Sequence, residues 1–248
     1  MTCRQQSPYT KLVERKRKWT PVAVTKGDLE EGAEDSIFRA LALRVLELPV
    51  KEFLEQGLEK DLPDIPGVIE ALKSNQKDED KHDLGFQYVV NAHGTDDRAE
   101  REAQSILNAW LDAPEHPILK ASILERSVFF VLLPFYRFCG DVGMRVLSSD
   151  ISRDEQTHTA LHGMVCHDLG IKSTPNLNRL RRATVAWVMD GLSRTPHPSE
   201  DKYLDKDFWI KQSDNLYLRG KASGLKATQR SRMPAFFETS NLNLPMYG

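Results

Sequence analysis

The chain lacks several features that would assign it to a common class of protein. Its three cysteines, Cys3, Cys139 and Cys166, are widely spaced, so they predict neither a disulfide framework nor a Cys-x-x-Cys motif. This use of cysteine fits a reducing cytoplasm, and the N-terminus has no apolar signal core. The longest apolar stretch, residues 128–134, is far too short to cross a bilayer. With a net charge of −2, nothing overall favours nucleic-acid binding.

Signals for β-structure are also missing, because no segment alternates strictly between apolar and polar residues. The 248 residues, of which 40% are apolar and 28% charged, suit a soluble globular protein with one sizeable core. Helical periodicity dominates, so we expect an all-α fold. The expected helices span residues 37–62, 68–91, 97–110, 118–147, 148–169, 178–192 and 205–223, and the fourth and fifth are either continuous or separated near Ser148.

Three parts of the chain are distinguished by this pattern: an irregular N-terminal arm (residues 1–33), a helical domain (34–232) and a C-terminal tail (233–248). The basic run at residues 15–18 is interpreted as a solvated part of the arm. Pro134 lies inside the apolar helix and removes a backbone hydrogen bond there. A simple kink is favoured over a π-bulge at this point.

A four-residue pattern occurs twice: Glu79-Asp80-Lys81-His82 and Glu155-Gln156-Thr157-His158 are both Glu-x-x-His. Residues three apart on a helix lie on the same face, so each copy directs a carboxylate and an imidazole to one place. Two such helices, with one Glu from each of two more, build the six-ligand site of di-iron or di-manganese carboxylate bundles. The sequence therefore predicts a metal site between helices.

The remaining two carboxylates are sought on the other helices. Glu125 lies in a very apolar helix, where a charged group needs a partner, and it precedes Glu155 by 30 residues, which suits a helix, a reversal and a helix. On the first helix Glu47 fits best opposite Glu79, and Glu52 is the competitor, since Pro49 disturbs the register. The expected set is Glu47, Glu79, His82, Glu125, Glu155 and His158, which suits iron or manganese better than structural zinc.

A single Glu-x-x-His in a helical protein is weak evidence, because most copies are solvated surface charge. The polar segment Asp78–Asp83 favours that interpretation locally. Two copies together with a carboxylate in an apolar helix favour the metal site. His162 lies one turn after His158 and could hydrogen-bond to one of the metal ligands. The favoured interpretation is a partly exposed helix residue.

The surroundings of the second motif carry a family resemblance. Residues 152–158, Ser-Arg-Asp-Glu-Gln-Thr-His, resemble the Arg-Asp-Glu-x-x-His signature of the ribonucleotide reductase small subunit, which generates the radical. The helix at Glu125, the stretches 215–225 and 233–238, and Trp19-Thr20-Pro21 are similar to other parts of that family. The resemblance implies a ferritin-like helical bundle with a di-metal carboxylate core and additional C-terminal helices.

For function, the resemblance implies that two metal ions (Fe/Fe or Mn/Fe, with Mn/Mn as a further option) react with O2 and store an oxidising equivalent. That equivalent passes to a separate large subunit for deoxyribonucleotide synthesis. By motif position His82, Asp154 and Trp19 would begin the transfer path. The family's radical tyrosine corresponds to Phe86, so the equivalent would stay on the metals. A homodimer is the family's usual state, and Tyr247 is a candidate contact to the large subunit.

Two other functions remain open at this point. A di-iron oxygenase acting on a small molecule or tRNA could use the same scaffold, and the apolar wall of Phe129, Phe130, Phe135 and Phe138 allows it. Such an enzyme needs an open pocket beside its metals. A ferritin-like bundle without metal would leave the six predicted ligands unexplained.

Overall fold

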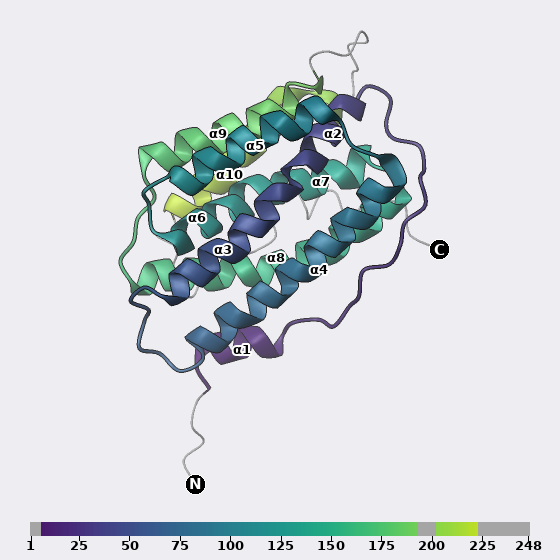
Figure 1. Ribbon diagram of the computed structural model, residues 1–248. Helices are drawn as coiled ribbons and strands as arrows, with labels where there is room; N and C mark the ends of the chain where they lie inside the picture. The colour runs from purple at the N-terminus through teal and green to yellow at the C-terminus, as the bar shows by residue number, and fades with distance from the viewer. Residues whose placement is uncertain (1–5, 193–201, 223–248) are drawn as a thin grey trace.

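The computed structural model describes residues 6–192 and 202–222, and every regular element within them is helical (Figure 1). The expectation of an all-α fold is therefore confirmed for this part of the chain. The elements are α1 (Pro8–Glu14), α2 (Glu34–Ala42), η1 (Leu43–Leu46), α3 (Glu47–Leu58), α4 (Val68–His93), α5 (Asp97–Asp112), α6 (Pro117–Leu124), η2 (Glu125–Phe129), α7 (Phe130–Cys139), α8 (Val142–Asp168), α9 (Pro175–Met189), η4 (Lys202–Leu204) and α10 (Lys206–Ala222).

Four helical runs enclose the centre of the molecule. Helix α3 contacts α4, α4 contacts α8, α8 contacts α6 and α7, and α6 returns to α3. Helices α2, α5, α9 and α10 pack around one side of this ring, whereas α1 lies across α4 and α8 (Figure 1). None of the described helices is long and apolar enough to span a bilayer.

The N-terminal arm is not wholly irregular, so that prediction is wrong for residues 8–14. Pro8 is the first residue of α1, where its missing N–H costs nothing, and Ser7 caps the helix by accepting from Thr10 N at 3.1 Å. Residues 233–248, the predicted tail, lie outside the described residues.

The first predicted helix is divided in three, because a 3-10 turn (η1) separates α2 from α3. Pro49 explains the break: within a regular helix its ring would clash with the carbonyl of Val45, four residues earlier. The expected end of this helix is also shortened, from residue 62 to Leu58.

The apolar helix predicted for residues 118–147 differs from the structure on both sides of Pro134. It stops at Cys139, and α8 starts at Val142, so the reversal lies at Gly140-Asp141 rather than near Ser148. Before Pro134, residues Glu125–Phe129 form one π-helical turn in which Phe130 N–H bonds to Glu125 O. The helix is therefore interrupted by a π turn before Pro134, whereas a simple kink was the favoured expectation.

Asp141 is the main polar anchor at this reversal. Buried between three segments, it accepts hydrogen bonds from Met144 N at 2.8 Å and Gly27 N at 2.9 Å, and it lies 2.7 Å from His93 Nε2. It thus caps α8 and also ties the N-terminal arm and the end of α4 to that cap.

We expect Asp141→Ala to lower the free energy of unfolding by about 3 kcal/mol, since it removes a cap and leaves buried donors without an acceptor. Asp96→Ala is the matched control, because Asp96 caps α5 at an exposed position through Ala99 N alone and should cost about 1 kcal/mol. Urea unfolding of both variants measures the difference, and equal losses would contradict the anchoring role.

Candidate metal centre

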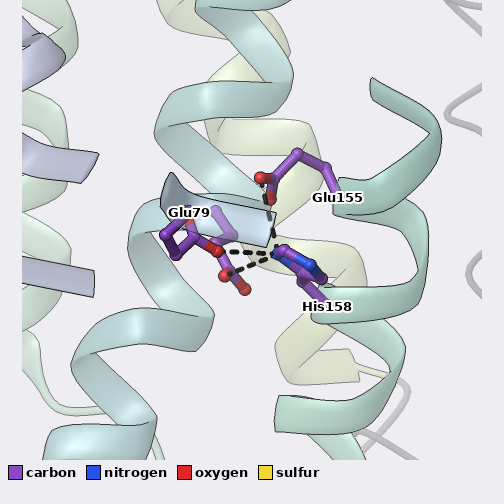
Figure 2. Close-up of side chains that lie close together, drawn as sticks. Glu79, Glu155 and His158 are labelled. Carbon is purple, nitrogen blue, oxygen red and sulfur yellow. Dashed lines mark ion pairs between the residues drawn. The ribbon is translucent and has the colours of Figure 1, made fainter. Parts of the chain in front are cut away.

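Three carboxylates and an imidazole meet inside the helical ring. Glu79 comes from α4, Glu125 opens the π turn, and Glu155 and His158 come from α8; all four are buried. One ligand atom from each lies within 4.8 Å of the others. Figure 2 shows the carboxyl groups of Glu79 and Glu155 directed toward the ring of His158. This cluster could bind a metal ion.

His82, the histidine of the first motif, adjoins the same cluster. Its Nδ1 lies 3.3 Å from Glu155 Oε1 and 3.4 Å from Glu79 Oε2. The rings of His82 and His158 are 5.7 Å apart between centroids. The structure therefore brings both Glu-x-x-His motifs to one place, as the spacing of the residues on their helices predicts.

The first-helix carboxylate is the least determined of the predicted ligands. Glu47 begins α3, and its side chain lies outside the described part of the structure. Glu52 is exposed and accepts a hydrogen bond from Gln56 at 2.9 Å. Glu52 is therefore not a member of the buried cluster.

The three carboxylates of the cluster carry more negative charge than its histidines neutralise. Burial opposes ionisation of Glu79, but His158 and His82 outweigh it, so the pKa of Glu79 lies well below its usual value. Burial and the charge of Glu125 raise the pKa of Glu155 to about 7. Burial alone would lower the pKa of His158, but the charges of Glu155 and Glu79 raise it well above its usual value.

Several inner atoms also lack hydrogen-bond partners, although they are fully buried. These are both carboxylate oxygens of Glu79 and Glu155, Glu125 Oε1 and His158 Nδ1. Uncompensated buried polar atoms are costly, and natural proteins keep them for a reason. Once His158 has lost its proton, a divalent cation would accept these lone pairs, so the residues fit a metal centre built from oxygen ligands and imidazole.

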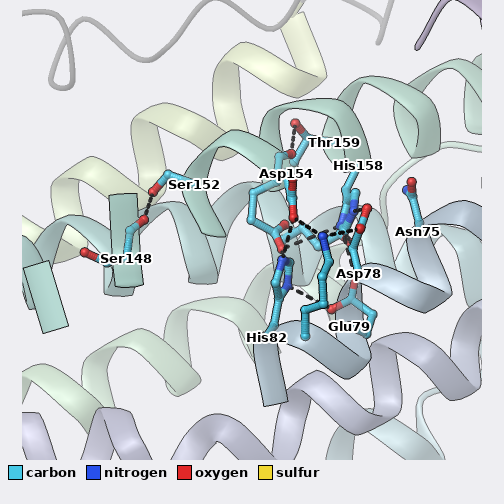
Figure 3. Close-up of polar contacts among 12 residues, drawn as sticks. Asn75, Asp78, Glu79, His82, Ser148, Ser152, Asp154, His158 and Thr159 are labelled. Carbon is cyan, nitrogen blue, oxygen red and sulfur yellow. Dashed lines mark hydrogen bonds and ion pairs between the residues drawn. The ribbon is translucent and has the colours of Figure 1, made fainter. Parts of the chain in front are cut away.

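Each motif supplies an aspartate that supports the histidine of the other motif (Figure 3). Asp154 precedes Glu155, and its Oδ2 lies 3.4 Å from His82 Nε2. Asp78 precedes Glu79, and its Oδ2 lies 3.1 Å from His158 Nε2. Carboxylates placed behind ligand histidines fix the ring orientation and raise its basicity. The two motifs thus brace one another across the α4–α8 interface.

Both aspartates are held as anions. Burial would raise the pKa of Asp78, but His158 and Lys16 lower it below its usual value. Burial would also raise the pKa of Asp154, but the hydrogen bond and charge of His82, together with the hydrogen bond from Trp19, lower it. Lys81 joins the pair, with Nζ 2.7 Å from Asp78 Oδ1 and 3.1 Å from Asp154 Oδ2.

Trp19 completes the outer layer on the side of His82. Its indole Nε1 donates to Asp154 Oδ2 at 2.7 Å, and the ring is stacked on His82 with centroids 6.2 Å apart. The ammonium of Lys81 lies 5.0 Å from the centre of the indole. The three residues that the family resemblance places on a transfer path, His82, Asp154 and Trp19, are therefore in mutual contact.

The interpretation of residues 15–18 as solvated holds for Arg15, Arg17 and Lys18, which are exposed, and is wrong for Lys16 alone. Lys16 is not solvated: it donates to Asp78 Oδ2 at 2.6 Å and to Asn75 Oδ1 at 2.7 Å, with 11% of its side chain exposed. Asp78 and Asn75 were also missed. The longer repeat Asp-Glu-x-x-His, present in both copies, was the available signal for Asp78.

His162 and Phe86 complete the immediate surroundings. The favoured interpretation of His162 as partly exposed is wrong, because its side chain is fully buried and Nδ1 lies 2.5 Å from Glu125 Oε2. Phe86 is buried on α4, one turn after His82, and packs against Tyr136 with ring centroids 5.8 Å apart.

The π turn that presents Glu125 is supported from outside the ring. Ser213 on α10 donates to Ser127 O at 2.6 Å, and Arg181 on α9 donates to Ser213 Oγ at 2.6 Å. A carbonyl inside the π turn thus receives a side-chain donor from another helix. The outer helices α9 and α10 therefore hold the backbone that carries a predicted ligand.

Comparisons of the chain with protein-family models, with curated proteins and with solved structures found no match. Function must therefore be inferred from the geometry of this centre. A buried, acid-rich, histidine-containing cluster with braced histidines can hold a metal and tune its chemistry.

We expect Glu155→Gln to make the metal-free protein more stable at pH 8 by roughly 1–3 kcal/mol. Because the pKa of Glu155 is raised in the folded state, its ionisation destabilises the fold increasingly from about pH 4.5 to about pH 7, and the full penalty applies above that window. The gain should therefore shrink at pH 5. Urea unfolding at both pH values measures it.

Glu70→Gln is the matched control, since Glu70 is an exposed residue of α4 and should change stability little at either pH. A Glu155→Gln variant less stable than the unchanged protein at pH 8 would contradict the presence of excess negative charge in the cluster.

Proposed function

We propose that the chain is the radical-generating small subunit of a class I-type ribonucleotide reductase, built on a ferritin-like bundle. The observation that carries this proposal is the contact path from the buried cluster through His82 and Asp154 to Trp19. An indole that contacts both a proposed metal-ligand histidine and the carboxylate behind it could pass an oxidising equivalent from the centre to a partner.

The ligands would be Glu79, His82, Glu125, Glu155 and His158, with Glu47 from α3 as the sixth. Oxygen-rich sites with two imidazoles suit iron and manganese, so an Fe/Fe or Mn/Fe pair is proposed, with Mn/Mn as the variant. Such a pair would react with O2 and supply a strong one-electron oxidant.

The outer residues would move charge between the centre and the surface. Trp19 Nε1–H already donates to Asp154 Oδ2, so loss of an electron from the indole can be accompanied by transfer of that proton to the carboxylate. Lys81, which contacts both Asp78 and Asp154, keeps the carboxylates charged before the transfer.

The position of a surface groove beside Trp19 supports transfer to a second protein. A groove of about 550 Å³ is lined by residues 19–28 and by residues from the start of α8, including Val142 and Val146. Trp19 lies in its wall, whereas none of the cluster carboxylates does. An oxygenase would need its substrate pocket beside the metals. The proposed partner is the reductase large subunit; a homodimer in the cytoplasm is proposed with it.

Phe86 determines where the oxidant would be stored. A phenylalanine has no hydroxyl and cannot form a tyrosyl radical, so the equivalent would remain on the metal pair. Phe86 is buried one turn after His82 and packs against the ring of Tyr136.

The proposal predicts two metal ions per chain after anaerobic loading with iron and manganese together. Exposure to O2 should then give an exchange-coupled paramagnetic signal without a tyrosyl radical, measured by metal analysis and electron paramagnetic resonance. Two irons that consume O2 continuously without a partner would favour the oxygenase instead. A chain that binds no metal would contradict both functions.

Trp19→Phe should abolish deoxyribonucleotide formation with the large subunit while leaving metal content and the oxygen-dependent signal unchanged, because only the outer end of the path is lost. Trp187→Phe is the matched control. Trp187, on α9, also donates its indole N–H to a carboxylate, that of Glu102 at 2.7 Å, but it lies outside the proposed path. Equal activity of the Trp19 variant and the unchanged protein would contradict the path.

A further inference from the structure

A line of hydrogen bonds reaches Glu125 from the N-terminal arm and does not pass through either Glu-x-x-His motif. Lys16 Nζ lies 2.7 Å from Asn75 Oδ1, Asn75 Nδ2 lies 3.2 Å from His162 Nε2, and His162 Nδ1 lies 2.5 Å from Glu125 Oε2. Asn75, His162 and Glu125 are completely buried. No other role in the proposed function uses Asn75 or His162.

The direction of every bond in this line follows from its first donor. A lysine ammonium can only donate, so the atom of Asn75 that faces Lys16 must be the amide oxygen. The amide nitrogen therefore faces His162, and it too can only donate. His162 Nε2 must accept that bond, which leaves the ring proton on Nδ1, where it is donated to Glu125 Oε2.

The consequence is a difference between the two oxygens of Glu125. Oε2 is occupied by the His162 donor, whereas Oε1 is buried without a hydrogen-bond partner and lies 3.4 Å from His158 Nδ1 inside the cluster. We propose that His162 is a positioning residue that holds Glu125 by Oε2, so that Glu125 offers only Oε1 to the metal centre, and that Lys16 and Asn75 fix the imidazole tautomer that does this.

The surrounding backbone supports the same restraint. Glu125 opens the π turn, whose Ser127 carbonyl is held by Ser213 from α10. The π turn is thus held by α10 through Ser127 O, and the Glu125 side chain is held by α8 through His162. Lys16 also belongs to the arm that carries Trp19, so one segment orders both the outer end of the path and the Glu125 carboxylate. The ligand part of this inference rests on the proposed function, but the tautomer does not.

The tautomer can be measured in the metal-free protein with 15N-labelled histidine. Two-bond 1H–15N correlation spectra should place the His162 proton on Nδ1, with Nε2 showing the shift of an unprotonated acceptor; the resonance is assigned by its loss in His162→Asn. In Asn75→Asp the amide donor becomes an acceptor, so Nε2 should become protonated. A proton on Nε2 in the unchanged protein would overturn the inference.

The positioning role is tested with three variants of α8. His162→Leu removes the donor and should weaken anaerobic Mn²⁺ or Fe²⁺ binding by roughly 10- to 100-fold, as is usual when a group behind a ligand is lost. His162→Asn, whose amide can donate from near the Nδ1 position, should recover most of that affinity. His167→Leu, an exposed histidine on the same helix, is the control and should bind metal normally.

A second readout reports on Glu125 itself. The separation of the carboxylate stretching bands in the infrared difference spectrum between metal-free and Mn²⁺-loaded protein should indicate one-oxygen binding for the unchanged chain, and His162→Leu should shift one carboxylate toward two-oxygen binding. Unchanged affinity and bands in His162→Leu would overturn the positioning role. If the unchanged protein binds no metal, the proposed function and the positioning role both fail, while the tautomer still stands or falls on the nitrogen spectra.

Discussion

The constraint on which the rest of the structure depends is the burial of three carboxylates in one small volume. Glu79, Glu125 and Glu155 approach one another where water cannot screen them, and the positive charge of His158 offsets only part of their repulsion. Without compensating interactions, such charged groups would be more stable at the surface, in contact with water. Their retention explains why the neighbouring helices carry the inward-facing Asp78, Asp154 and His162, and why Lys16 of the N-terminal arm reaches Asp78.

These inward polar groups form a layer that holds the cluster in place. Asp78 and Asp154 each support the histidine of the opposite motif, so α4 and α8 cannot shift along one another without disturbing both rings. Lys16 and Trp19 attach the N-terminal arm to the same two aspartates. An arm with little regular structure thereby becomes part of the centre, and the groove beside Trp19 lies where this arm meets α8.

Much of the fold followed from local pattern. Helix α4 was expected to end at residue 91 and ends at His93, just before Gly94, and α5 begins at Asp97 as expected, directly after its Asp96 cap. Both predictions succeed because caps and glycines of positive φ act within one turn of chain. The errors arose where two local signals compete. Residues 8–14 were assigned to an irregular arm although Pro8 is favoured at a helix start, and the reversal at Gly140-Asp141 was expected near Ser148 instead.

By itself the sequence determined that this chain is helical and that Glu79, His82, Glu155 and His158 lie on helix faces that can meet, since residues three apart share a face of any helix. The family resemblance already grouped Asp154 with His82 and Trp19. Only the tertiary structure placed Asp78 behind His158, and Lys16 and His162 against the inner polar groups. Those contacts join residues far apart in the chain, and their partners depend on how the helices are rotated and offset. Local spacing contains no information about that rotation.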